Sequence, residues 1–193
     1  MGEPRVIYLH GFNSSPASTK ARVLGRYLEG LGVGERYACP ALPPLAEAAL
    51  GEVEALMRRH PGAKYCFVGS SLGGFYATHL AEKHDARAVL LNPAIEPHVG
   101  LRAFLGPQEN LYTRERYELT ERHLEQWARL YVPRITPSRY LLIVETGDEV
   151  LDYRAAVARY EGAEQIVVEG GDHTVRSFEE HLPTIARFAG LLT

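Results

Sequence analysis

The feature that most constrains this chain is its regular alternation of short apolar runs with stretches of helical periodicity. The runs of strand length lie at residues 5–10, 35–42, 64–70, 86–92, 139–147 and 164–170. They are continuously apolar more than alternating, which is typical of parallel strands covered on both faces. The pattern predicts an α/β protein with a doubly wound, mostly parallel sheet of about six strands, right-handed crossovers and helices on both faces.

Helical periodicity marks most of the segments between or after these runs, at residues 18–32, 45–62, 75–85, 153–162 and 177–192. In the first stretch Val23, Tyr27 and Leu31 follow one another at four-residue steps, and a glycine ends the pattern as it often ends helices. The last stretch is interrupted by Pro183, which we expect near the first turn of a helix.

Residues 96–138 interrupt the alternation of apolar runs and helical stretches, because they are charged and aromatic, with a helical middle and prolines at the end. The segment is either a long crossover connection or a small helical lid, and we expect the lid. Nothing else suggests a second domain, a repeat or a linker, so residues 1–193 are predicted to form one domain. The apolar and aromatic side chains of residues 96–138 either line a substrate pocket or pack the lid onto the core: Leu101, Phe104, Leu105, Tyr112, Tyr117, Trp127 and Tyr131.

Composition excludes several classes of protein. A formal net charge of −3 without a basic stripe argues against a nucleic-acid partner. No stretch approaches 18 consecutive apolar residues and the first residues lack a signal-peptide core, so we expect no membrane span and a cytoplasmic location. Cys39 and Cys66 have no metal-ligand spacing and are predicted to be buried free thiols.

The sequence GSSLG at residues 69–73 carries the first sign of chemistry, since it matches G-x-S-x-G with Ser71 at its centre. An apolar strand precedes it and a helix-forming run follows, which is the context of a nucleophile elbow. The glycines would let strand and helix approach while the Ser71 hydroxyl projects from the turn. The alternative is a glycine-rich turn or phosphate loop, although the lysine and spacing of a Walker loop are absent. Ser70 lacks the flanking glycines and is expected to satisfy local backbone groups at the strand end.

A serine nucleophile needs a positioned base, and histidine is the residue type that most often serves. Among the eight histidines, His173 directly follows the strand at 164–170, at the sheet edge where reactive groups gather. His181 lies further into the closing helix, and His98 in the lid is left as a candidate substrate contact. Four others lie in helical, charged surroundings typical of surface histidines: His60, His79, His84 and His123.

The predicted acid is Asp148, which stands just after the strand at 139–147. Asp152 lies where an aspartate commonly caps the next helix. Asp172 would have difficulty turning back onto the ring of its neighbour His173. The resulting order of Ser71, Asp148 and His173 is the chain order of the α/β-hydrolases.

Two backbone N–H groups are candidates for an oxyanion hole. Leu72 begins the helix after the nucleophile, where the helix dipole favours negative charge. Phe12 follows the first strand in the sequence HGF and would supply the second donor. We expect the His10 imidazole to hold this loop, whereas Asn13 either contacts substrate or belongs to a capped turn.

The sequences HGFNSSP, GSSLGGFYAT, LNPA, TGDEVLDYR and GGDH together make the chain resemble the small bacterial esterases of the YqiA type, within the α/β-hydrolase superfamily. The resemblance covers nearly the whole length and is much more specific than G-x-S-x-G alone. It implies an α/β-hydrolase fold with Ser71 as nucleophile, His173 as base and Asp148 as acid, and with Phe12 and Leu72 as oxyanion donors. It also implies hydrolysis of carboxylic esters or acyl thioesters.

The sequence therefore predicts a serine hydrolase that acts on a small-molecule acyl ester, or on an acyl-CoA thioester, through an acyl-enzyme. No cofactor is expected, and no metal, because ligand patterns such as H-x-H and H-E-x-x-H are absent. Two alternatives stay open: a peptidase or another acyl-transfer enzyme on the same site, and a binding protein that keeps the fold without catalysis. Acyl-chain length, leaving group and oligomeric state are left open as well.

Overall fold

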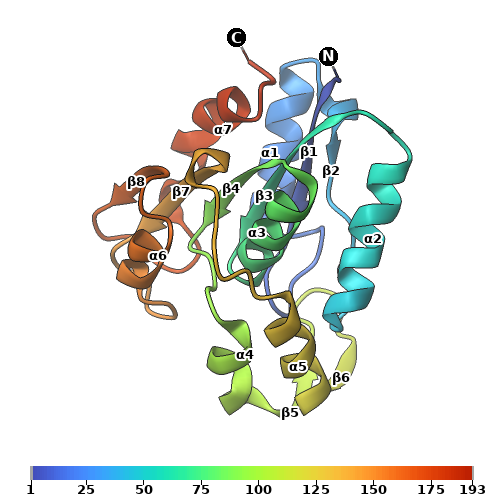
Figure 1. Cartoon of the computed structure of the whole chain (residues 1–193), viewed down its shortest axis with the longest axis vertical. Coiled ribbons are helices and arrows are strands. Elements are labelled where there is room, and N and C mark those ends of the chain that lie inside the picture. Colours follow the sequence, from blue (N-terminus) through green and yellow to red (C-terminus); the bar gives the residue numbers. More distant parts are fainter. Residues whose placement is uncertain (1, 193) are drawn as a thin grey trace.

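A parallel sheet forms the centre of the computed structural model, which describes residues 2–192 (Figure 1). Its strands are β1 (Pro4–Leu9), β2 (Tyr37–Ala38), β3 (Lys64–Ser70), β4 (Arg87–Leu91), β7 (Tyr140–Glu145) and β8 (Glu164–Val168). Their order is β2-β1-β3-β4-β7-β8, and every neighbouring pair is parallel. Each of the six predicted runs contains one strand. The run at 35–42 contributes only two paired residues, because a 3-10 turn, Gly34–Arg36, precedes them and Pro40 follows them.

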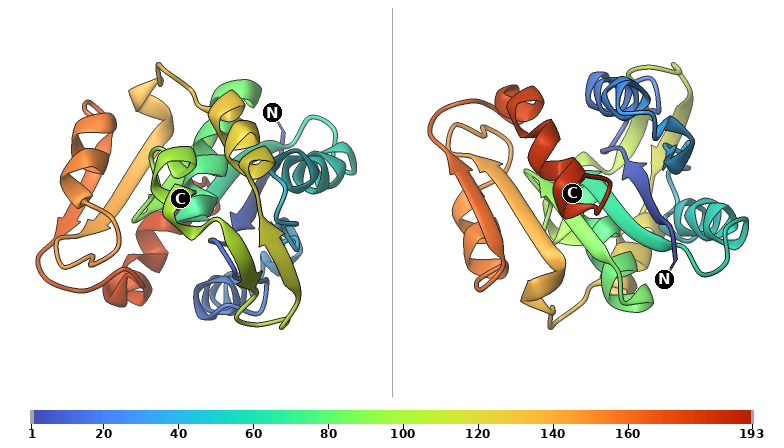
Figure 2. Two further views of the ribbon diagram at one scale, coloured as in Figure 1. Left: turned by 90° about the horizontal axis from the view of Figure 1, so that it is seen from below. Right: turned by 90° about the horizontal axis from the view of Figure 1, so that it is seen from above.

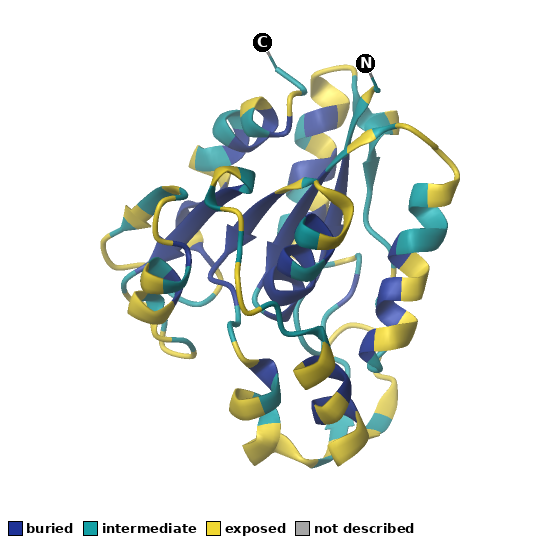
Figure 3. Cartoon of the chain, in the orientation of Figure 1, coloured by how far each residue is buried: buried dark blue, intermediate teal, exposed yellow. Residues whose placement is uncertain are grey.

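Helices cover both faces of the sheet, as the continuous apolar runs predict (Figure 2). Helices α1 (Thr19–Gly30) and α7 (Leu182–Phe188) pack on the face that receives Val6 and Tyr8 of β1. Helices α2 (Ala46–Arg58), α3 (Leu72–His84) and α6 (Tyr153–Arg159) pack on the face that receives Ile7 and Leu9. Successive side chains of a strand point to opposite faces, so apolar residues of the strands form a core on each side of the sheet. Figure 3 shows that the central strands are buried.

The closing helical stretch is divided into two pieces. A 3-10 helix, Arg176–His181, leads directly into α7, and Pro183 lies in the first turn of α7. Proline is tolerated there because the first N–H groups of a helix have no partner within the helix. The predicted stretch is therefore helical throughout, with a change of helix type just before the proline.

Residues 96–138 leave the sheet after β4: the part up to α5 lies beyond the carboxyl ends of the strands, at the bottom of Figure 1, and the rest returns to the start of β7. They include α4 (Pro97–Gly100), a 3-10 helix (Leu101–Phe104), β5 (Gly106–Glu109), β6 (Arg116–Leu119), α5 (Glu121–Leu130) and a 3-10 turn (Pro137–Arg139). The antiparallel hairpin of β5 and β6 is an addition to the helical segment that the sequence predicts. The description of this segment as a lid stays a prediction.

Two further expectations concern the chain as a whole. Cys66 is buried and Cys39 is half-buried, and both are free thiols, so the predicted burial holds fully for Cys66 alone. Across residues 2–192 no helix has both the length and the apolar character needed to cross a membrane. The cytoplasmic location stays a prediction.

Candidate active site

Ser71 lies in the sharp turn between β3 and α3, with φ 55° and ψ −119°. A positive φ is uncommon for a residue that has a Cβ, so the surrounding structure must hold it. The Ser71 N–H donates to the Leu91 carbonyl at 3.0 Å, and the Ser71 carbonyl accepts from Gly74 at 2.9 Å and from Ala94 at 3.0 Å. These bonds fix the serine backbone, while Ser70 is the buried last residue of β3.

Two glycines make the turn sterically possible. A Cβ atom on Gly69 would lie 2.2 Å from the Gly73 carbonyl oxygen. A Cβ atom on Gly73 would lie 1.9 Å from the carbonyl oxygen of Leu9 in the neighbouring strand. Both distances are far inside van der Waals contact, so the end of β3, the start of α3 and the end of β1 approach this closely only because the Cβ atoms are missing.

The structure brings Ser71, His173 and Asp148 into one line of hydrogen bonds. His173 Nε2 lies 3.1 Å from Ser71 Oγ, and His173 Nδ1 lies 2.8 Å from Asp148 Oδ2 and 3.0 Å from Oδ1. The three residues come from the loops that follow β3, β8 and β7, at the carboxyl edge of the sheet. The three side chains are thus close enough for the predicted roles of nucleophile, base and orienting acid, and those roles stay a prediction.

The environment of Asp148 indicates which nitrogen of the His173 ring carries the proton. Its Oδ1 accepts the N–H groups of Val150 at 2.8 Å and Leu151 at 2.9 Å, and its side chain is 1% exposed. A carboxylate held in this way is an acceptor, so Nδ1 of His173 is the donor. Nε2 is then left to accept the Ser71 hydroxyl proton.

The two other aspartates near the site have separate partners. Asp152 caps α6 by accepting the Arg154 N–H at 2.9 Å, in the position where the sequence places a cap. Asp172 accepts the Thr174 N–H at 2.8 Å and the Arg176 Nε at 2.6 Å. Asp148 is therefore the aspartate in contact with the His173 ring.

The loop that carries His173 is held by Glu145, the fully buried last residue of β7. Its carboxylate accepts the Asp172 N–H at 2.7 Å, and the N–H and hydroxyl of Ser177 at 2.8 and 2.7 Å. Burial opposes ionisation, but these hydrogen bonds outweigh it and hold the pKa of Glu145 below its usual value. Asn92 also links β7 to the loop that carries His173. Its side chain accepts the Glu145 N–H and donates to the Asp172 carbonyl, each at 3.0 Å.

No sequence pattern predicts these roles of Glu145 and Asn92. A charged residue at the end of the otherwise apolar run LLIVE was the available signal for Glu145. Its bonding partners lie some thirty residues further along the chain, in a loop whose path the sequence does not define.

The two predicted oxyanion donors belong to segments that both adjoin Ser71. Leu72 is the first residue of α3, and the first N–H groups of a helix have no acceptor within it. The loop after β1 also comes close to Ser71, since a Cβ atom on Gly11 would lie 3.3 Å from the Ser71 Cβ. Phe12, the next residue, therefore presents its backbone close to the proposed nucleophile.

His10 holds this loop in place, as the sequence predicts. Its Nε2 accepts the Leu42 N–H at 3.1 Å, which leaves the ring proton on Nδ1, 3.1 Å from the Gly11 carbonyl. Burial lowers the pKa of His10, and the bond to Gly11 only partly offsets this effect. The imidazole is therefore a neutral link between two loops.

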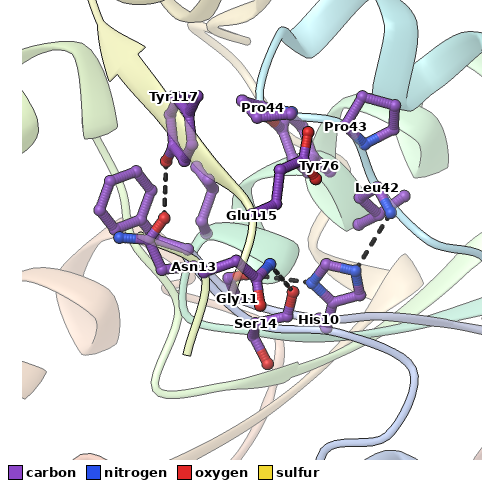
Figure 4. Close-up of a pocket in the computed structure, with 13 residues that line it drawn as sticks. His10, Gly11, Asn13, Ser14, Leu42, Pro43, Pro44, Tyr76, Glu115 and Tyr117 are labelled. Atoms are coloured by element: carbon purple, nitrogen blue, oxygen red, sulfur yellow. Dashed lines mark hydrogen bonds between the residues drawn. The ribbon is translucent and has the colours of Figure 1, made fainter. Parts of the chain in front are cut away.

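A small cavity of about 50 Å³ opens beside the two predicted oxyanion donors (Figure 4). Phe12 and Leu72 line it together with Tyr76 of α3 and with Glu115 and Tyr117 of the hairpin region. A larger hollow of about 950 Å³ lies at the opposite edge of the sheet, where β3 and β4 begin, and has no contact with the Ser71 turn. The smaller cavity adjoins both predicted oxyanion donors, although Ser71 and His173 themselves do not line it.

The predicted lid residues separate into different environments. Tyr117 lines the cavity, whereas Trp127 is buried and donates its indole N–H to the Tyr76 hydroxyl at 2.7 Å. Phe104, Leu105 and Tyr112 are exposed. His98 lies against Tyr131, with ring centroids 6.2 Å apart, and does not line the cavity.

The residues between 2 and 192 contain no group of three or more His, Cys, Asp or Glu side chains that could hold a metal ion. The site as described consists of a serine, a histidine, a carboxylate and two backbone N–H groups. This set fits nucleophilic acyl transfer, which requires a nucleophile, a proton acceptor and donors for an oxyanion.

Comparisons with known proteins agree with this architecture. Residues 5–190 match the profile of an uncharacterised protein family, UPF0227. Among solved structures, a candidate hydrolase of Agrobacterium vitis S4 superposes with a TM-score of 0.78 at 21% identity, covering 97% of this chain and 88% of the other. Mouse alpha/beta hydrolase domain-containing protein 10 gives 0.75 at 16% identity, covering 100% and 92%. A monoacylglycerol lipase of Paleococcus ferrophilus gives 0.65 at 17% identity, covering 99% and 97%. At these identities the likeness establishes the α/β-hydrolase fold.

Proposed function

The chain belongs to the UPF0227 family, and from this membership and the geometry of the site we propose that it is a serine hydrolase that cleaves carboxylic esters through an acyl-enzyme. The family is the YqiA-type group that the sequence resembles, so that prediction is confirmed. The observation that carries the proposal is the 3.1 Å contact between Ser71 Oγ and a His173 ring whose other nitrogen is bonded to buried Asp148.

In the proposed reaction Ser71 Oγ attacks the acyl carbonyl carbon while His173 Nε2 accepts the hydroxyl proton. The carbonyl oxygen becomes an oxyanion that accepts hydrogen bonds from the Phe12 and Leu72 N–H groups. His173 then returns the proton to the leaving alcohol as the bond between acyl carbon and leaving oxygen breaks. A water molecule, activated by His173, releases the acid and restores Ser71.

Asp148 serves this sequence by fixing the orientation of the ring and by stabilising the imidazolium that forms twice in each cycle. The two backbone bonds to its Oδ1 keep the carboxylate in place through these changes of charge. An acyl-CoA thioester would follow the same steps with a thiol as the leaving group, and it is the second substrate class that we include in the proposal.

Labelling with a fluorophosphonate tests the proposal, because this reagent reacts with an activated serine. We expect stoichiometric labelling of the native protein at Ser71, and none in Ser71→Ala. The loss of kcat for ester hydrolysis in Ser71→Ala should approach the roughly 10⁶-fold loss seen when a member of a triad is removed. The neighbouring serine provides a matched control, so Ser70→Ala should keep its labelling.

Full esterase activity in folded Ser71→Ala would overturn the proposal. Absence of labelling in the native protein would favour the binding-protein alternative. A peptidase or acyltransferase would share the labelling, and analysis of the products with amide substrates and with competing alcohol acceptors would reveal it.

A further inference from the structure

The hairpin of β5 and β6 is bonded to the loop that follows β1, although the two are about a hundred residues apart in the sequence. The Leu111 N–H donates to the Asn13 carbonyl at 2.9 Å, and Asn110 Nδ2 donates to the Ser14 carbonyl at 2.7 Å. The Tyr117 hydroxyl donates to Asn13 Oδ1 at 2.7 Å (Figure 4). The hairpin therefore holds the residues directly after Phe12.

Asn13 is the centre of these contacts. Its φ of 51° lies in the left-handed region, which asparagine enters more readily than most residues that have a Cβ. Both ends of its side-chain amide are bonded, since Oδ1 accepts from Tyr117 and Nδ2 donates to Gln108 Oε1 at 3.1 Å. Both partners belong to the hairpin, so the conformation of Asn13 depends on it.

The Tyr117 hydroxyl remains a hydrogen-bond donor to Asn13. Burial and the nearby Glu115 raise the pKa of the Tyr117 hydroxyl to about 12, so the group keeps its proton throughout the neutral range. Its ring packs near His123, with centroids 6.1 Å apart, and His123 in turn accepts the Thr120 N–H before α5. The ring of Tyr117 is thus supported by the first turn of α5.

The segment of backbone that carries the Phe12 N–H is held at both ends. On one side His10 is bonded to Leu42, and on the other Asn13 is bonded to Tyr117. An oxyanion donor is effective only when it lies about 2.7–3.1 Å from the position of the developing charge, and removing one donor costs about 10² to 10³ in kcat. A clamp on both sides of Phe12 provides this placement.

We propose that the hairpin completes the oxyanion hole and that Tyr117 is a positioning residue, which holds the Phe12 N–H in place through Asn13. The inference rests on the proposed function, since it assigns Phe12 to that reaction. It also gives residues 96–138 a part in the chemical step, in addition to any part in covering the site.

The test compares Tyr117→Phe with Tyr112→Phe, which removes a hydroxyl from an exposed tyrosine of the same hairpin. Tyr117→Phe keeps the ring against His123 and removes only the donor. We expect kcat for a short-chain ester to fall about 10- to 100-fold with KM changed by less than about threefold, because part of one donor's contribution is lost. Tyr112→Phe should match the native protein.

Two further measurements separate positioning from a general loss of structure. Kinetic constants are referred to the concentration of sites that react with a fluorophosphonate, which removes the effect of unfolded protein. A trifluoromethyl ketone, whose oxyanion would occupy the hole, should bind Tyr117→Phe more weakly by about the same factor as the loss of kcat. Asn13→Ala should show a similar loss, and the double variant should be no worse than the poorer single variant.

Unchanged kcat in Tyr117→Phe would overturn the inference, as would a rise in KM alone, which would make Tyr117 merely a wall of the cavity. Additive effects of Asn13→Ala and Tyr117→Phe would do the same. Each of these results leaves the proposed function standing as long as Ser71 is labelled and required. Failure at Ser71 would instead remove the proposed function itself.

Discussion

Strained backbone conformations gather at the residues around the proposed chemistry. Asn13, Ser71, Asn92 and Val175 all have positive φ values, between 40° and 56°. Val175 is the most unusual, because a β-branched side chain is rarely accommodated there, and it lies two residues after His173. Ser71 and Val175 each cost of order 1–3 kcal/mol and persist only where other contacts hold them, whereas asparagine enters the left-handed region more readily. Here those contacts include Glu145, Asn92 and the hairpin.

Gly73→Ala tests the close packing behind the nucleophile. The new methyl group would lie 1.9 Å from the carbonyl oxygen of Leu9, and a backbone atom cannot move aside as a side chain can. We expect a loss of at least about 1–3 kcal/mol in the free energy of unfolding, as for overpacked cores, together with loss of esterase activity. Urea denaturation and ester hydrolysis measure the two effects.

Gly51 offers the matched control, because it lies in the middle of α2 and a Cβ there would meet nothing within 4 Å. Gly51→Ala should increase stability by about 0.5–1 kcal/mol through helix propensity and leave activity unchanged. If Gly73→Ala were as stable and as active as Gly51→Ala, the close approach of β1 and α3 would be refuted.

His10 predicts a pH dependence of stability. Its pKa in the folded protein is lowered, chiefly by burial, so at acidic pH the unfolded chain binds a proton that the folded protein does not. The contribution of His10 is therefore fully present above the unfolded pKa of about 6.5, and it is lost as the pH falls from there towards the lower folded pKa. Free energies of unfolding in urea between pH 8 and 5 should decline less steeply in His10→Gln than in the native protein.

The exposed histidine His60 serves as the comparison, and His60→Gln should keep the native slope. Equal slopes in all three proteins would show that the Leu42 N–H is not held by a neutral His10 ring.

At the scale of elements, the sequence predicts the strands and helices whose apolar residues follow a regular spacing, and it does not predict the short hairpin of β5 and β6. The strands and helices around the sheet carry long apolar patterns and follow from them. The β5 strand, GPQE, begins with Gly106 and Pro107 and has no apolar alternation, and the alternation of β6, RYEL, extends over only four residues. The turn between them is formed by Asn110, whose Oδ1 accepts the N–H groups of Tyr112 and Thr113 at 2.9 and 3.0 Å. That asparagine was the one local signal of a turn.

We expect the hairpin to limit the substrate as well, because it forms part of the cavity wall beside Phe12 and Leu72. At about 10–15 Å³ per water, a cavity of 50 Å³ has room for roughly four water-sized groups. We expect acetyl and propionyl esters to have kcat/KM values at least about tenfold above that of the octanoyl ester of the same alcohol, since the longer chain keeps its methylene groups in water.

A series of esters with one leaving group and acyl chains of increasing length measures this preference directly. The same series of thioesters shows whether the limit belongs to the acyl side. A kcat/KM that rises steadily to octanoyl would contradict a short acyl pocket and would place the chain on the exposed apolar residues outside it.

At the scale of the whole molecule, the proximity of Ser71, Asp148 and His173 was predictable, because the loops that follow the strands of a parallel sheet lie at one edge. The contacts that hold these loops were not, because they join residues such as Asn13 and Tyr117, or Glu145 and Ser177, that no periodic pattern relates. A single sequence identifies the reacting groups by their residue types. The groups that place them are ordinary polar residues, which become distinctive only by their contacts.

The prediction that residues 1–193 form one domain has a direct test in the only tryptophan of the chain. Trp127 belongs to α5 in the segment 96–138, yet it is 1% exposed and is bonded to Tyr76 of α3 in the shared core. We therefore expect the segment to unfold together with the sheet, in one cooperative transition. In urea, tryptophan fluorescence and far-UV circular dichroism should give superimposable curves, with free energies that agree within about 10–15%.

The buried thiol of Cys66 in β3 gives an independent probe of the sheet, read as its reactivity in a Cys39→Ser protein. Its exposure should follow the same curve as the fluorescence of Trp127. If the fluorescence changed at lower urea than both other signals, residues 96–138 would be a lid that opens without unfolding the sheet. The hydrogen bond between Tyr117 and Asn13 would then be broken while the sheet is still folded. Esterase activity should be lost over the same urea concentrations as the change in fluorescence, before the loss of secondary structure.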